Sequence, residues 1–337
     1  MEESITSLSI VIPIFKGSNF IEKLLKRVDQ TKNILSKSKV NLIEVICVCD
    51  EPIDDSLKII KKLQLKFNYL RVIELSSNKG QHLATSAGIM SSIGDWICTI
   101  DEDLQHDPIN IIDLLLKSTK FSKDLVYARS KFGTHSNSFY RNFFSKLSKN
   151  LISLITGHNT KITSSYRLIR GNLARSCATC MDKFQYLDNL LFYQTSKHRR
   201  GYINLNLIDK RDNKSGYKFN ELLSHFFKNF YSSEIGLKRF FLFLFTPIFL
   251  SSSLVGIFLI KTAQDNSVYI SNPGWLSIFT MQFIVLIILG LFFTYSVKVY
   301  SIIALRSLAM APYLLIDRSN DKLIYENLKK NIDTKNN

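Results

Sequence analysis

Four short apolar runs, separated by segments of helical periodicity, occupy the first hundred residues and constrain the fold more than any other feature. The runs cover residues 8–14, 42–49, 70–75 and 96–100. Helices are predicted between them over 19–36, over a stretch that ends near Phe67, and over 81–92. Short apolar runs bounded by polar loops are typical of buried strands. Because strands and helices alternate, the sequence predicts an α/β fold with a doubly wound, Rossmann-like, mostly parallel sheet.

Polar loops follow or neighbour the carboxyl ends of these predicted strands. They contain residues 16–17, 50–55, 78–80 and 101–105. Open parallel sheets bind ligands in the crevice beyond the carboxyl ends of their strands. We therefore expect these loops to line one crevice, which is the candidate functional site.

Two later stretches, Phe240–Ile260 and Leu276–Val297, contain no charged residue. A helix rises about 1.5 Å per residue and the hydrocarbon core of a bilayer is about 30 Å thick, so roughly 20 apolar residues are needed to cross it. Both stretches are long enough. They predict two transmembrane helices, and a pair of buried core helices is the alternative.

Basic residues around the two predicted spans indicate their orientation. Lys228, Lys238 and Arg239 precede the first span, and Lys298 and Arg306 follow the second. An excess of Lys and Arg marks the cytoplasmic side, and the polar first residues do not resemble a cleavable signal peptide. We therefore expect a two-span membrane protein with its N-terminal domain and both termini in the cytoplasm.

These features divide the chain into six predicted parts. They are a cytoplasmic α/β domain (1–216), an interfacial helix (217–239), a first span (240–260), an extracytoplasmic loop (261–274), a second span (275–297) and a cytoplasmic tail (298–337). The interfacial helix is predicted from apolar residues near helical spacing, and an ordinary packed helix is the alternative. The polar tail after Asp317 is expected to be loosely ordered.

The formal net charge of +16 points to one of two kinds of partner. A basic chain is suited to nucleic acid, or to anionic lipid and phosphorylated substrates. With two predicted spans the second is favoured, so we expect a membrane partner and no nucleic acid. The five cysteines fit reduced thiols, and a single Cys177-x-x-Cys180 pair is not expected to bind metal or to act in redox chemistry.

The sharpest motif is the acidic stretch Asp101–Pro108, directly after the fourth predicted strand. In an extended chain, residues two apart point to the same side, so Asp101 and Asp103 can present two carboxylates to one cation. Such oxygen ligands suit Mg²⁺ or Mn²⁺, which would also hold a diphosphate and neutralise it as it departs. A solvated acidic turn or a helix N-cap is the alternative interpretation of the two carboxylates alone.

The same stretch resembles a family motif. Inverting family-2 glycosyltransferases with the GT-A fold carry Asp-x-Asp-Leu-Gln-Asp/His-x-Pro, in particular the polyprenyl-phosphate glycosyltransferases related to dolichol-phosphate mannose synthase. The chain matches this motif at Asp101, Asp103, Leu104, Gln105 and Pro108. Further segments resemble the family at Ser9–Pro13, Asn78–His82, Ser164–Leu168 and Arg211–Tyr217. Two C-terminal spans are also common in this family.

The resemblance implies a nucleotide-sugar donor, a divalent cation (Mg²⁺ or Mn²⁺) and roles for the matched residues. Nucleotide-sugar binding is expected at Pro13, Asp50, Lys79, Gly80 and Asp101, and metal binding at Asp101 and Asp103. The expected catalytic residues are Asp103, Gln105, Arg167 and Asp188. Phosphate or acceptor binding is expected at Arg167, Arg211, Lys214, Ser215 and Tyr217.

The chain departs from the family in three places. Lys16-Gly17 stands where an Asn-Glu pair is usual, and residues 49–52 replace an Asp-Asp-Gly-Ser nucleotide loop. Residues 162–167 lack both carboxylates of a segment that can supply a base. A phosphate monoester has a second pKa of about 6, so a lipid phosphate is already an anionic nucleophile at neutral pH, whereas a sugar hydroxyl needs a base. If a base is used, Asp188 is the expected one.

These observations favour transfer of a sugar, with inversion, from a UDP- or GDP-sugar to a polyprenyl phosphate such as undecaprenyl or dolichyl phosphate. The reaction would take place at the cytoplasmic face of a membrane and serve cell-envelope polysaccharide biosynthesis. Two alternatives stay open: transfer to a hydroxyl of a glycolipid or cell-surface polysaccharide, and a non-catalytic membrane scaffold that retains the fold. A homo-oligomer is compatible with the sequence.

Overall fold

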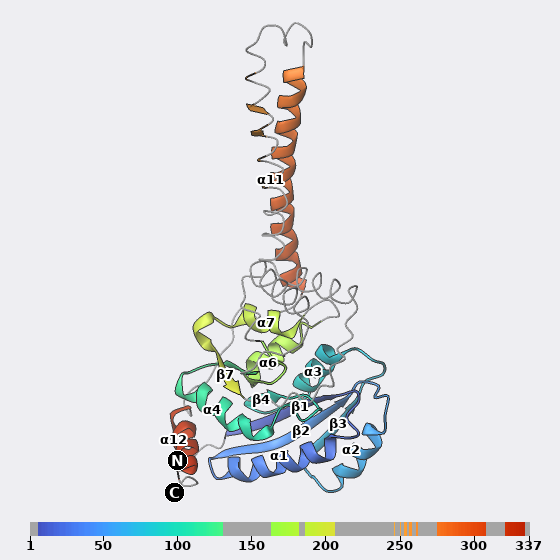
Figure 1. Ribbon diagram of the computed structural model, residues 1–337, viewed down its shortest axis with the longest axis vertical. Coiled ribbons are helices and arrows are strands. Elements are labelled where there is room, and N and C mark those ends of the chain that lie inside the picture. The colour runs from blue at the N-terminus through green and yellow to red at the C-terminus, as the bar shows by residue number, and fades with distance from the viewer. Residues whose placement is uncertain are drawn as a thin grey trace, which may run out of the picture.

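The computed structural model describes residues 6–130, 163–181, 186–205, 275–307 and 321–333, together with residues 246, 250, 253–254, 256–257 and 261. The predicted interfacial helix lies outside these residues, as do most of the predicted first span and of the loop that follows it. The described residues of the N-terminal part form a layered α/β domain (Figure 1).

Seven strands and a set of short helices build this domain. The strands are β1 (Thr6–Ile14), β2 (Val40–Cys49), β3 (Leu70–Glu74), β4 (Trp96–Thr99), β5 (Leu125–Ser130), β6 (Arg167–Arg170) and β7 (Arg200–Leu205). The α-helices are α1 (Ile21–Ser36), α2 (Ser56–Gln64), α3 (Gln81–Met90), α4 (Ile111–Lys120), α6 (Gly171–Ala178) and α7 (Leu187–Gln194). Short 3-10 helices cover Pro108–Asn110 and Lys197–Arg199. The alternation of apolar runs with segments of helical periodicity therefore predicted β1 to β4 and α1 to α3 correctly, apart from small differences at their ends.

The seven strands form one mixed sheet in the order β3-β2-β1-β4-β6-β5-β7. The pairs β1–β2, β2–β3, β1–β4 and β5–β7 are parallel. Strand β6 is antiparallel to both of its neighbours, β4 and β5. The expectation of a mostly parallel sheet is thus confirmed, and the carboxyl ends of β1, β2 and β4 lie at the same edge.

Helices cover both faces of the sheet (Figure 1). Alternate residues of β1 pack on opposite sides: Leu8, Ile10 and Ile12 belong to one buried cluster, and Val11 belongs to the other. The first cluster includes residues of α1, α2 and α4, and the second includes residues of α3, α6 and α7. This two-sided burial explains why β1 and β2 read as nearly continuous apolar runs, as strands of parallel sheets do.

Helix α3 lies close against β1 and β2 because Gly88 faces the sheet. A Cβ atom at residue 88 would lie 2.4 Å from Cγ1 of Val11 and 2.8 Å from Cγ2 of Val48. Real Cβ atoms do not approach other atoms so closely, and close packing leaves little room for the sheet to yield. Glycine at this position therefore sets the distance between α3 and the sheet.

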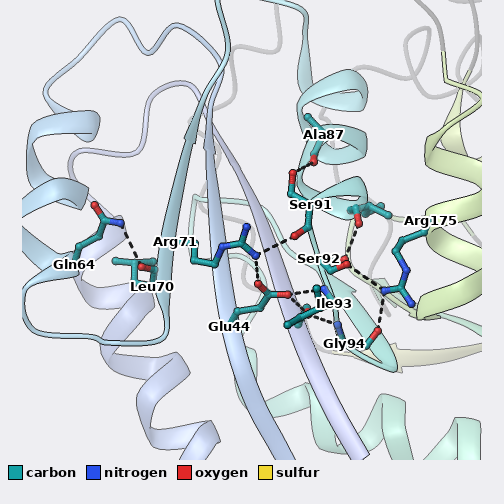
Figure 2. Close-up of polar contacts among 12 residues, drawn as sticks. Glu44, Gln64, Leu70, Arg71, Ala87, Ser91, Ser92, Ile93, Gly94 and Arg175 are labelled. Carbon is teal, nitrogen blue, oxygen red and sulfur yellow. Dashed lines mark hydrogen bonds and ion pairs between the residues drawn. The ribbon is translucent and has the colours of Figure 1, made fainter.

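The turn that follows α3 is held from two sides (Figure 2). On one side the buried carboxylate of Glu44 accepts a hydrogen bond from the Ile93 amide (2.8 Å) and forms an ion pair with Arg71. On the other side Arg175 of α6 donates to the carbonyl oxygen of Gly94 (3.0 Å). A buried carboxylate is stable only when its hydrogen bonds are made, so this network fixes the end of α3 and with it the direction of the helix.

The C-terminal tail contains an ordered helix, α12 (Asp321–Asp333), which corrects the expectation of a loosely ordered tail. Helix α12 packs on α4 and buries Ile324 and Leu328 in the same core as α1 and α4. Asp321 forms a buried ion pair with Arg170 of β6, whose guanidinium lies 3.9 Å from the centre of the Trp96 ring. Helix α12 is therefore part of the core of the domain.

A long helix, α11 (Trp275–Ser307), covers the predicted second span and projects away from the sheet (Figure 1). Large apolar side chains along it are exposed, including Ile278, Leu291 and Phe292 at 66–70%. In the described part of the chain, no helix combines the length and the apolar character required to cross a membrane.

Candidate active site

A cavity of about 480 Å³ lies at the carboxyl ends of β1, β2 and β4, where the sequence predicted the crevice. Its described lining residues are Pro13, Ile14, Phe15, Asp50, Asn78, Gly80, Gln81, Ala84, Asp101, Glu102 and Asp103. Four of these are carboxylates, and none is Lys or Arg. The site therefore has a negative lining, which favours a cation in the cavity.

The carboxylate of Asp50 holds the loop that precedes α3. One oxygen accepts from the Lys79 amide (2.7 Å) and the other from the Gly80 amide (2.8 Å). Gly80 has a φ of +85°, which glycine adopts without strain. Asp50 is 3% exposed. Its carboxylate binds two amides of the chain itself and so shapes the wall of the cavity.

The acidic stretch is a turn, which corrects the expectation of an extended chain. Residues 102–103 form the turn, and Leu104 has a φ of +60°. Asp101 and Asp103 nevertheless line the same cavity, as predicted. The Asp103 carboxylate accepts from the Gln105 amide (3.1 Å), so the contact that the structure shows for Gln105 uses its backbone and not its side chain.

Two side chains from other elements orient the carboxylate of Asp101. Gln81, at the start of α3, donates to Oδ1 (2.6 Å), and Ser165 donates to Oδ2 (2.6 Å). The Asp101 amide donates to Nδ1 of the buried His106, whose ring lies 4.9 Å from that of Tyr166. The backbone and the carboxylate of Asp101 are thus both fixed by neighbours.

Glu102 joins the acidic loop to the loop after β1. Its carboxylate oxygens accept from the backbone amides of Phe15 (3.0 Å) and Lys16 (2.9 Å). Burial raises the pKa of Glu102 above its ordinary value, the two amides lower it, and the nearby Asp54 and Asp101 raise it further. The net effect is a raised pKa.

A second cavity of about 250 Å³ lies nearby and shares Gln81 with the first. Its described lining residues are Gln81, His82, Thr85, Thr163, Ser164, Ser165, Arg167 and Asp188. Arg167 of β6 and Asp188 of α7 form an ion pair, and the buried Tyr127 donates to the same oxygen of Asp188 (2.7 Å). Arg167 and Asp188, for which separate roles were predicted, therefore form a pair.

The remaining predicted phosphate-binding residues lie outside the described residues: Arg211, Lys214, Ser215 and Tyr217. The structure adds further residues to the site. Gln81 and Ser165 belong to segments that match family motifs, and Glu102 lies between the two predicted metal ligands. Tyr127 carried no sequence signal, because it reaches Asp188 only through the pairing of β5 with β6.

A mostly parallel α/β sheet with carboxylates at its strand ends defines the class of domain, a ligand-binding domain of the open-sheet type. The match to a known family is more specific. Residues 9–175 match glycosyl transferase family 2. The matched segment is just under half of the chain.

Curated relatives carry related names. Over 158 residues the chain is 30% identical to an undecaprenyl-phosphate 4-deoxy-4-formamido-L-arabinose transferase of Proteus mirabilis, covering 47% of this chain and 46% of the relative. It is 32% identical over 158 residues to the enzyme of that name from Photorhabdus laumondii, with the same two coverages. An uncharacterized glycosyltransferase of Synechocystis is 28% identical over 186 residues, covering 54% and 56%. The chain spans about half the length of these relatives.

A solved structure with partial similarity is glucosyl-3-phosphoglycerate synthase of Mycobacterium tuberculosis in complex with Mn²⁺, uridine-diphosphate-glucose and phosphoglyceric acid. It is 18% identical, with a TM-score of 0.46, and the match covers 65% of this chain and 76% of that one.

Proposed function

We propose that this protein transfers a sugar from a nucleoside diphosphate sugar to a polyprenyl phosphate, with inversion at the anomeric carbon. One observation carries the proposal: within a segment that matches glycosyl transferase family 2, the cavity at the strand ends is lined by four carboxylates and by no described Lys or Arg. An anionic diphosphate binds beside carboxylates only if a cation lies between them. The donor would be a UDP- or GDP-sugar.

The residues present fit a divalent metal. Mg²⁺ is usually held by one or two carboxylates together with substrate phosphates and water, and Asp101 and Asp103 supply two carboxylates on one cavity. The described residues contain no group of three or more His, Cys, Asp or Glu suited to a metal, so the diphosphate and water would complete the shell. When bound, Mg²⁺ or Mn²⁺ would supply the positive charge that stabilises the departing diphosphate.

The chain's own residues would position the donor. Asp50 fixes the amides of residues 79 and 80 and so shapes the wall beside the nucleotide. Gln81 and Ser165 orient the Asp101 carboxylate. Such orientation contributes to catalysis because the groups are already held in the reactive geometry when the substrates bind.

The second cavity would receive the acceptor, next to the donor across Gln81. Its lining is rich in hydroxyl groups, and its one described carboxylate, Asp188, is already ion-paired with Arg167. A phosphate acceptor does not need a base. The names of the undecaprenyl-phosphate transferases among the relatives support the same acceptor class.

The membrane anchor is part of this proposal. It is supported by two uncharged stretches of sequence and by the exposed apolar side chains of α11. A large exposed apolar surface calls for a partner, and a bilayer would supply one and also present the lipid acceptor. The basic residues that flank both stretches favour a cytoplasmic catalytic domain.

The acceptor is tested with purified full-length protein in detergent, undecaprenyl phosphate, Mn²⁺ and a panel of labelled UDP- and GDP-sugars. Label in a lipid-extractable product that mild acid hydrolyses to free sugar is the expected result. Label on an added glycolipid, and none on the lipid phosphate, would support the hydroxyl acceptor instead. No binding and no turnover of any donor would support a scaffold.

A further inference from the structure

The carboxylate of Glu102 lines the cavity, lies between two loops and accepts hydrogen bonds from backbone amides. Among the described residues, no Lys or Arg forms an ion pair with it. It accepts from Phe15 at 3.0 Å and from Lys16 at 2.9 Å. The amides of the next two residues are also taken by side chains: Gly17 donates to Ser56 Oγ (2.9 Å) and Ser18 to Asp54 (3.0 Å). These four consecutive amides therefore all donate to side chains of other segments, and those of Phe15 and Lys16 share one carboxylate.

Glycine at residue 17 makes room for this arrangement. A Cβ atom there would lie 2.7 Å from Oε2 of Glu102. Gly17 does not have a positive φ, so its backbone conformation is open to any residue, and an alanine here would displace the Glu102 carboxylate. Gly17 and Glu102 are therefore a matched pair.

The acidic loop needs to be held from outside. Leu104 has a φ of +60°, which is unfavourable for a residue with a branched side chain, and such conformations persist only where the surroundings impose them. Glu102 lies between Asp101 and Asp103, so the hydrogen bonds of its carboxylate restrain the backbone from which the two candidate ligands project. Its two amide contacts are the anchor that the loop has on the β1 side.

We propose that Glu102 is a positioning residue: by binding the amides of Phe15 and Lys16 it fixes the directions of Asp101 and Asp103. The inference rests on the proposed function, in which the two aspartates hold a metal and a diphosphate.

Metal binding tests this proposal without any need for turnover. We would measure the binding of Mn²⁺, with UDP or GDP present, by the electron paramagnetic resonance signal of the free ion. The Glu102→Gln variant should bind Mn²⁺ about tenfold more weakly, as is typical when a neighbour of a metal ligand is lost. The matched control is Asp95→Asn, because Asp95 also accepts a backbone amide, that of Ser7 (2.9 Å), at the amino end of β1. Its Mn²⁺ affinity should equal that of the wild type.

A double-mutant cycle tests the pairing. Gly17→Ala should weaken Mn²⁺ binding about tenfold in the wild-type background and change it little when residue 102 is already alanine. Neighbouring residues that share one interaction are non-additive in this way. Losses that simply multiply in Gly17→Ala/Glu102→Ala would contradict the proposal, as would an unchanged affinity in Glu102→Gln.

Amide hydrogen exchange separates this proposal from the proposed function. The amides of Phe15 and Lys16 should exchange about fivefold faster in Glu102→Ala, in line with the loss of one ordinary hydrogen bond each. Unchanged exchange would overturn the positioning role, whatever the enzyme transfers. A wild type that binds Mn²⁺ but transfers no sugar would contradict the proposed function alone.

Discussion

The carboxylates of the site differ in role because they differ in hydrogen-bond partners. Asp50 is occupied by two backbone amides and serves the loop before α3. Asp101 is held by two side chains, which can rearrange when a ligand binds. The sequence predicted that Asp50, Asp101 and Asp103 would gather at one edge, because strand ends locate residues. It could not predict their partners, since Ser165 lies more than sixty residues away along the chain.

Asp54 should make folding stability depend on acid pH. Burial is the largest single effect and raises its pKa, but the hydrogen bonds from Ser56 and from Ser18 together outweigh it and lower the pKa to about 2. A carboxyl of lowered pKa stabilises the fold above its unfolded pKa, about 3.9, and this contribution is lost as the pH falls through 2. The expected contribution is about 1 kcal/mol after allowance for solvent screening.

Chemical unfolding between pH 5 and pH 2 measures this effect. The wild type should lose more stability over this range than Asp54→Asn, by about 1 kcal/mol. Asp55→Asn, which changes an exposed neighbour, serves as the control and should follow the wild type. Identical pH profiles for the wild type and Asp54→Asn would show that the hydrogen bonds to Asp54 do not stabilise the fold.

At the scale of elements, α3 carries most of the connection between fold and site. Its first residue, Gln81, contacts Asp101, its middle lies on the sheet through Gly88, and the turn after it is held by Glu44 and Arg175. The helix was predictable from its periodicity. Its close approach to the sheet was not, because a glycine in a helix carries no sign of which neighbour it faces.

Gly88→Ala should destabilise the domain by about 1–3 kcal/mol, because the new methyl group has no space beside Val11 and Val48. Thermal unfolding in detergent would show this as a lower Tm. The control is Met90→Ala on the same helix, where the side chain is 53% exposed and the cost should be within about 0.5 kcal/mol. Equal Tm values for the two variants would mean that α3 does not approach the sheet as described.

At the scale of the whole molecule, the chain returns to the domain as α12, far along the sequence from β7. The return was missed, although Ile324 and Leu328 stand four residues apart, as the buried residues of a helix do. Because most residues of the tail are polar, this short apolar face was not recognised in the sequence. Strand β6 was also missed, because its antiparallel place between β4 and β5 depends on contacts distant in sequence.

Asp321→Asn should weaken the attachment of α12, because it leaves the buried charge of Arg170 with one carboxylate fewer. Asp124 stays 3.9 Å from Arg170, so the expected loss is about 2 kcal/mol, below the full cost of breaking a buried pair. Limited proteolysis and thermal unfolding would measure it. Glu326→Gln, exposed on the same helix, should match the wild type, and equal protease resistance of the two variants would contradict the buried pair.

The most direct test of the proposed function is metal-dependent turnover of the donor. Full-length protein would be given undecaprenyl phosphate and a panel of UDP- and GDP-sugars, and release of nucleoside diphosphate would be followed with Mn²⁺ and with a chelator. We predict release with one donor, its loss with chelator, and a decrease of at least about a hundredfold in Asp103→Ala at an unchanged Tm. Release that survives both the chelator and Asp103→Ala would contradict the account.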